Sequence, residues 1–197
     1  MNLDFSSALP YALIFPAVVT IAALLLWWSH KKRQAHLARL AASLGGETVT
    51  AFMADAYVRL SSGAGEVRIK LMPGSDDDPP ILELRSLSPL GFSLSITKES
   101  RATRALERWG ILKEVKIGDP LFDDQYLLQG SDPARVLSFL QGRGRREAVD
   151  YFFRNGFRSI QANPDGVFAQ KPKYQNSDLE PLLIQAHLEQ LGKLIAV

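Results

Sequence analysis

The sequence predicts an α+β protein in which an N-terminal transmembrane helix precedes one soluble domain, and in that domain an antiparallel β-meander is packed by helices. Three observations support this prediction. A long apolar run without charge lies near the N-terminus, several short segments alternate apolar and polar residues, and later segments repeat apolar residues at helical spacing. We therefore expect a transmembrane anchor over 1–29, a juxtamembrane helix over 30–46 and a soluble α+β domain over 47–197.

The anchor is predicted from Leu9 to Trp28, a run of 20 residues without a charged side chain. As a helix rising about 1.5 Å per residue, this run is about 30 Å long, the thickness of the hydrocarbon core of a bilayer. Trp27 and Trp28 close the run, as is typical of a membrane interface, and Pro16 is expected to kink the helix. A cleaved signal peptide is the alternative, but the chain starts without Lys or Arg, and Leu-Trp-Trp is a poor cleavage site.

The direction of the anchor follows from the charges beside it. Lys31, Lys32 and Arg33 follow the apolar run, whereas Asp4 is the one charged residue before it. Positive flanks stay on the cytoplasmic side of a membrane, so we expect a single-pass protein of the bacterial inner membrane with its N-terminus outside and its domain in the cytoplasm. The same basic residues could also contact anionic lipid headgroups, although setting the topology is a sufficient role for them.

The charge balance argues against a nucleic-acid partner. The whole chain has a formal net charge of +2, but residues 41–197 hold 19 basic and 20 acidic residues, so the excess belongs to the membrane-proximal part. A nucleic-acid-binding domain would carry a basic surface of its own. The chain has no Cys, which excludes disulfide bonds, Cys-ligated zinc and thiol catalysis. We expect no cofactor and no metal.

Alternation of period two predicts the strands of the meander. In 81–87, for example, Leu82 and Leu84 are expected inside the domain, and Glu83 and Arg85 in water. The strands of the meander are expected over 47–53, 56–60, 66–72, 81–87 and 92–97. Three further strands are expected over 125–128, 157–162 and 166–170.

Helices are predicted between and after these strands. Asp132 and Pro133 fit the N-cap and first position of a helix, and a second helix is expected over 145–154. The last helix is expected to begin near Ser177 or Asp178, with Ser177 and Glu180 as a capping box. A short helix is also expected over 100–109.

Histidine, the commonest catalytic base, gives no site in this sequence. His30 and His36 flank the membrane run, and His187 lies in the last helix. None has the spacing of a metal-ligand set with another His or with paired carboxylates, so we expect each one on the surface or packed in the core.

The most distinctive stretch for chemistry is Gly118–Tyr126, where Asp119, Asp123 and Asp124 lie close to Phe122. Paired carboxylates can act as acid and base when burial raises the pKa of one of them. The simpler interpretation is a Gly-Asp-Pro turn leading into a strand, with Phe122 and Tyr126 packing inward. Both interpretations stay open at the level of sequence.

The run Gly-Asp-Pro-Leu-Phe-Asp-Asp-Gln-Tyr-Leu-Leu, followed by Gly130-Ser131-Asp132-Pro133-Ala134, resembles a pattern in an uncharacterised family of bacterial membrane-anchored proteins. In that family a Gly-Asp-x-x-Phe-Asp turn and a strand precede a helix. The resemblance covers residues 115–160. It implies a bacterial membrane location and transfers no functional residues, because the family has no assigned activity.

Three functions are compatible with these patterns. The first is a non-enzymatic binding or interaction module held at the cytoplasmic face of the membrane, with the bilayer itself as one partner. The second is a membrane-tethered enzyme that uses Asp119, Asp123 or Asp124. The third is a lipid-interacting domain, which requires a continuous apolar groove.

Overall fold

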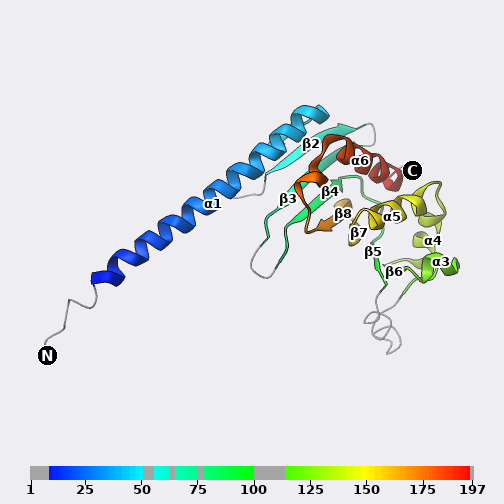
Figure 1. Cartoon of the computed structure of the whole chain (residues 1–197). Helices are drawn as coiled ribbons and strands as arrows, with labels where there is room; N and C mark the ends of the chain where they lie inside the picture. Colours follow the sequence, from blue (N-terminus) through cyan, green and yellow to red (C-terminus); the bar gives the residue numbers. More distant parts are fainter. Residues whose placement is uncertain (1–8, 51–55, 63–64, 75–77, 100–113, 196–197) are drawn as a thin grey trace, which may run out of the picture. The chain divides into compact units, whose positions relative to one another are not determined.

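The computed structural model of the chain describes residues 9–50, 56–62, 65–74, 78–99 and 114–195 (Figure 1). It is an α+β structure with one eight-stranded sheet. The chain divides into two compact units, Met1–His36 and Leu37–Val197. This division falls inside the expected juxtamembrane helix 30–46.

The first helix, α1 (Leu9–Leu44), runs through 36 residues without a break at Pro16. Thr20 Oγ1 donates a hydrogen bond to the carbonyl oxygen of Pro16 at 2.8 Å. Gly45 ends the helix in a left-handed conformation with φ of +68°, which a glycine adopts without steric cost. The backbone N–H of Gly46 then bonds back to the carbonyl of Ala41 at 2.8 Å.

In the described part of the chain, no helix is both long and apolar enough to cross a membrane. Within the expected anchor Leu9–Trp28, the side chains of residues 9–15, 17 and 26 are not described.

The sheet is antiparallel throughout, with the strand order β1-β2-β3-β4-β8-β7-β5-β6. Each of these strands lies within a few residues of an expected one; alternation indicated those over 66–72, 81–87 and 92–97, and turn signals indicated several of the others. Their bounds are β1 (Glu47–Val49), β2 (Tyr57–Ser62), β3 (Gly65–Met72), β4 (Ile81–Ser86), β5 (Leu94–Lys98), β6 (Tyr126–Gly130), β7 (Ser159–Asn163) and β8 (Gly166–Pro172).

The expected five-stranded meander is wrong in one respect. Strands β1 to β4 do form a meander, but β5 does not pair with β4. The hairpin β7–β8 lies between them, with β8 beside β4 and β7 beside β5. The apolar alternation of a strand determines which face it buries, but not which strand becomes its neighbour.

The helices after α1 are α3 (Pro120–Asp123), α4 (Pro133–Gln141), α5 (Arg145–Arg154) and α6 (Pro181–Ile195). Asp132 caps α4 as expected, with its side chain accepting the N–H of Arg135. The capping box of Ser177 and Glu180 is wrong, because a 3-10 turn, η1 (Asn176–Leu179), precedes α6. Asp178 closes that turn instead, since its carboxylate accepts the N–H of Gln175 at 2.8 Å.

The core lies between the helices and one face of the sheet, and α6 packs against β4 and β8. Ile184 and Leu191 on α6 are fully buried, as their helical spacing predicts, and Phe152 of α5 fills the centre. The helix expected over 100–109 lies outside the described residues, as does the second half of the strand expected over 47–53.

Candidate functional site

The predicted carboxylate site is built around the short helix α3. Asp119 caps it, with Oδ1 accepting the N–H groups of Leu121 and Phe122 at 3.2 and 3.4 Å. The other oxygen of Asp119 accepts a hydrogen bond from Arg146 at 3.0 Å. Phe122 is buried and packs on the ring of Tyr126, 4.7 Å between centroids. The turn and its inward-pointing rings therefore match the simpler interpretation of this stretch.

Asp123 is the buried carboxylate of this group, at 8% exposure. Its two oxygens accept the backbone N–H groups of Ile117 and Gly118, each at 3.0 Å. Asp124, at the end of α3, is exposed. The structure thus brings the three carboxylates into one turn, where Asp119 and Asp123 hold the backbone in place.

His187 is a buried group that the sequence pattern did not single out. It is fully buried on α6 against the rings of Tyr151 and Phe157, and its Nδ1 lies 3.0 Å from the hydroxyl of Tyr151. Its Nε2 is buried without a hydrogen-bond partner among the described residues. Burial, with the nearby cation of Lys171, lowers the pKa of His187 to about 4, and Asp178 opposes this shift. At neutral pH the ring is uncharged.

Among the described residues, no three His, Asp or Glu side chains come together as a metal-ligand set.

A groove of ≈ 520 Å³ lies among the end of α1, strands β2 and β3, and helix α6. Its lining combines apolar and polar side chains. The lining residues are Ser43, Leu44, Gly45, Leu60, Ser61, Val67, Gln185, Leu188, Glu189, Gly192 and Ile195. Its size is in the usual range for small-molecule sites.

Gly192 lies in the lining of this groove and in the interior of helix α6, where a glycine lowers the stability of the helix relative to alanine. A Cβ at this position would meet no atom within 4 Å. Gly192→Ala is therefore expected to raise the free energy of unfolding by about 0.5–1 kcal/mol, because Ala loses less backbone entropy in a helix. Urea unfolding of the full chain in mild detergent checks this, and a destabilised variant would contradict it.

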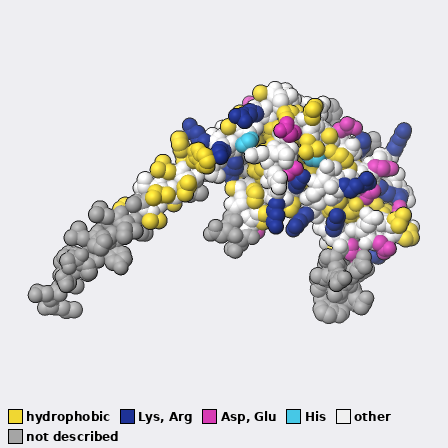
Figure 2. Space-filling model, viewed as in Figure 1, with side chains coloured by type: hydrophobic (Ala, Val, Ile, Leu, Met, Phe, Trp, Pro, Cys, Tyr) yellow, Lys and Arg dark blue, Asp and Glu magenta, His cyan; other side chains and the backbone are white. Residues whose placement is uncertain are grey.

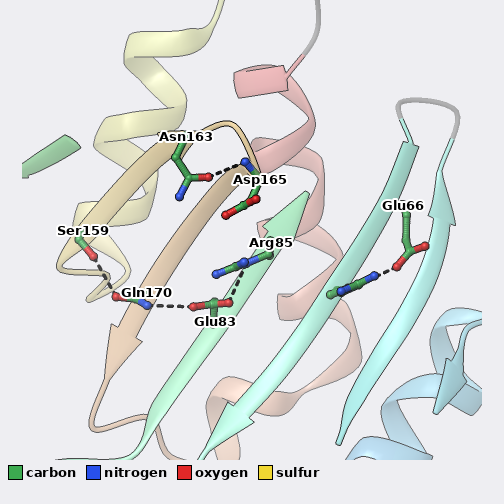
Figure 3. Close-up of polar contacts among 8 residues, drawn as sticks. Glu66, Glu83, Arg85, Ser159, Asn163, Asp165 and Gln170 are labelled. Carbon is green, nitrogen blue, oxygen red and sulfur yellow. Dashed lines mark hydrogen bonds and ion pairs between the residues drawn. The ribbon is translucent and has the colours of Figure 1, made fainter. Parts of the chain in front are cut away.

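The sheet face opposite to α5 and α6 carries polar side chains, among them Glu83, Arg85 and Gln170 (Figure 3). Glu83 accepts hydrogen bonds from Arg85 Nε at 3.0 Å and from Gln170 Nε2 at 2.9 Å. Ser159 Oγ extends this chain to Gln170 at 3.4 Å. The expectation that Glu83 faces water is wrong, since it is 6% exposed under these neighbours.

The described part of α1 before His36 exposes large apolar side chains, followed by a group of Lys and Arg side chains (Figure 2). At 3.6 residues per turn these apolar positions point in all directions around the helix. They are Val18, Val19, Ile21, Leu24, Leu25, Trp27 and Trp28. Lys31 lies over the ring of Trp27 at 4.8 Å, and Lys32 over the ring of Trp28 at 3.8 Å.

Comparison with known protein families, curated proteins and solved structures finds no match to this chain. The functional argument therefore rests on the chain's own residues.

Proposed function

We propose that this protein is a non-enzymatic binding module held at a membrane by the Leu9–Trp28 segment of α1. The proposal of an anchor rests on the exposed apolar side chains that point in all directions around α1. A helix on the surface of a globular protein keeps one polar face, whereas a helix that is apolar on every side needs an apolar surrounding. The hydrocarbon core of a bilayer provides it.

The end of this segment supports the same proposal. The Trp27–Lys31 and Trp28–Lys32 pairs place aromatic rings beside cations, as at a membrane–water interface. Lys31, Lys32 and Arg33 on this side favour the cytoplasm for the domain and the outside for the N-terminus.

The contacts in the α3 turn favour binding over catalysis. A general acid or base must be able to reach a substrate proton. Both carboxylate oxygens of Asp123 accept hydrogen bonds from backbone N–H groups. The carboxylate of Asp119 accepts hydrogen bonds from the first N–H groups of α3 and from Arg146. An enzyme using Asp119, Asp123 or Asp124 would have to break these contacts or act through Asp124.

A lipid-interacting domain is the second candidate, and the groove beside α6 favours it. Leu44, Leu60, Val67, Leu188 and Ile195 supply an apolar lining that a single acyl chain could occupy. This role is compatible with the anchor, because the groove lies in the unit Leu37–Val197.

Membrane extraction tests the anchor. The full chain is expected to sediment with bacterial membranes and to resist carbonate. Val18 and Val19 lie at the centre of the segment, and the double change Val18→Glu and Val19→Glu costs about 5 kcal/mol of insertion free energy at that depth. The double variant is expected in the carbonate-soluble fraction.

Leu182→Glu is the matched control, because Leu182 is 82% exposed on α6. It is expected to stay with the membranes. Extraction of the unchanged chain by carbonate, or retention of the double variant, would overturn the anchor. Reporter fusions after Val197 then give the direction: activity of a cytoplasm-only reporter supports the proposed orientation, and activity of an outside-only reporter reverses it.

A further inference from the structure

Three arginines occupy directly opposed positions on neighbouring strands of the polar sheet face. Arg59 of β2 is the register partner of Arg68 of β3, and Arg68 is the partner of Arg85 of β4. We call these three residues the arginine row. Their side chains are 40%, 37% and 31% exposed, so solvent and solutes reach each one.

This arrangement puts three like charges in line, although a glutamate beside each arginine offsets part of their repulsion. Directly opposed residues have Cβ atoms about 4.5–5.5 Å apart, and like charges at such positions repel one another. A polar sheet face needs water-compatible residues, but it does not need three guanidinium groups in line. An anion bound across the row would turn this repulsion into attraction.

Two of the three arginines, Arg68 and Arg85, are held in place through one edge of the guanidinium. The Nε–H of Arg68 donates a hydrogen bond to the carboxylate of Glu66 at 2.7 Å. The guanidinium of Arg68 lies over the ring of Tyr57, 4.9 Å from the ring centroid. Arg85 repeats the pattern, with Nε bonded to Glu83 and the guanidinium 4.6 Å from the centroid of Phe168. Arginine has five N–H donors, so each contact leaves the two terminal nitrogens available.

Those terminal nitrogens make no hydrogen bond with any residue in the described part of the chain. In Arg59 the Nε atom also lacks a hydrogen-bond partner among the described residues, and it is covered from solvent. The carboxylate of Glu47 approaches Arg59 only to 4.0 Å and is itself 72% exposed. Arg68 and Arg85 therefore present oriented terminal N–H donors, and Arg59 adds a third guanidinium, none of which the described residues hydrogen-bond.

We propose that the arginine row binds the phosphate group of a soluble phosphomonoester. Such a group carries about −1.5 to −2 charges and three strong acceptor oxygens, so it can engage several guanidinium forks at once. A carboxylate has two oxygens and a single charge, which matches one fork. Lys70, in the register position opposite Glu83, is a fourth cationic residue on this face of the sheet.

This inference names the ligand of the proposed binding module and rests on that role, but it does not depend on the membrane anchor. The carbonate extraction tests the anchor alone, and the titration below tests the ligand alone. A failure of one is therefore distinguishable from a failure of the other.

Calorimetric titration of the full chain in detergent micelles with phenyl phosphate tests the proposal. Saturable binding at one site is expected, weaker at higher salt because the site is exposed. Arg68→Gln and Arg85→Gln are each expected to weaken binding about tenfold or more, since each removes a charge-assisted contact. Arg68→Lys keeps the charge without the fork and is expected between Arg68→Gln and the unchanged protein.

The matched control is Arg154→Gln, because Arg154 is a 77% exposed arginine on α5 outside the row. It is expected to bind like the unchanged protein. Thermal unfolding without ligand checks folding: Arg68→Gln is expected to keep its Tm within a few degrees and to lose the rise in Tm that phenyl phosphate gives the unchanged protein.

Several results would overturn the proposal. They are no binding of phenyl phosphate at millimolar concentration, equal weakening by Arg154→Gln, or binding of benzoate as tight as that of phenyl phosphate. Binding to nanodiscs that contain phosphatidate, or to single-stranded nucleic acid, without binding to phenyl phosphate would also overturn it, because the partner would then belong to another class.

Discussion

Replacing Asp123 by Asn is expected to lower the free energy of unfolding by about 1–3 kcal/mol. Asp123 accepts one backbone N–H on each oxygen, from Ile117 and from Gly118. Asn has nearly the same shape, but one of the two oxygens becomes an NH₂ group, which donates. One backbone N–H then faces a donor at a part-buried site, and a donor left there without an acceptor costs about 1–3 kcal/mol.

Asp124→Asn is the control for this change. Asp124 is the next residue and is exposed, so its substitution is expected to cost less than about 1 kcal/mol. Urea unfolding of the full chain in mild detergent, followed by circular dichroism, measures both variants. Equal midpoints for Asp123→Asn and the unchanged protein would show that the two hydrogen bonds contribute little, and would reopen a catalytic role for this carboxylate.

Acid is expected to destabilise the domain through His187. The pKa of His187 is lowered to about 4, whereas its ordinary value is 6.5. A proton therefore binds the unfolded chain more readily than the folded one. The stability due to the neutral, buried ring is complete above about pH 6.5 and is lost progressively as the pH falls to about 4. At about 1.4 kcal/mol per pKa unit, the loss is about 3 kcal/mol.

The groups around His187 set this window. Burial is the main cause of the lowered pKa, followed by the cation of Lys171, and the carboxylate of Asp178 opposes them. Lys171 and Asp178 are bonded to each other at 2.8 Å. The pKa of Asp178 is itself lowered from 3.8, so its stabilising contribution is lost only at a pH below that of the His187 transition.

His187→Gln tests this explanation, because an amide can keep the contact with the Tyr151 hydroxyl and does not titrate. The unfolding free energy of this variant is expected to change by less than about 1 kcal/mol between pH 6.5 and 4.5, against about 2–3 kcal/mol for the unchanged protein. His36→Gln, a change on α1 outside these contacts, should keep the full dependence. The same slope in His187→Gln and in the unchanged chain would assign the effect to other groups.

Local patterns predicted the elements of this fold well. Period two and turn residues together located the strands, and the Asp132–Pro133 pair indicated the start of α4, because these signals depend on neighbours along the chain. The place of β7 and β8 between β4 and β5 was not predictable in this way. Strand pairing is decided by packing across the whole sheet, and the pattern of apolar residues within one strand does not specify its neighbours.

The two candidate sites differ in the same way, because one is formed by neighbours in the sequence and the other by strand pairing. The turn at Asp119 and Asp123 was recognisable because its residues lie together in the sequence. The arginine row was not, because Arg59, Arg68 and Arg85 come into line only through the register of β2, β3 and β4. Similarly, Glu83 is buried through Gln170, 87 positions further along the chain.

The position of β8 beside β4 also affects how the domain is made. During synthesis β4 is complete at Ser86, but its partner β8 is complete only at Pro172. At about 5–20 residues per second, the free edge of β4 stays unpaired for roughly 4 to 17 seconds. An unpaired strand edge is a template for pairing with other chains, and long-range pairing is slow. The β7–β8 hairpin therefore closes the sheet late, and the nascent chain is most open to misassociation in that interval.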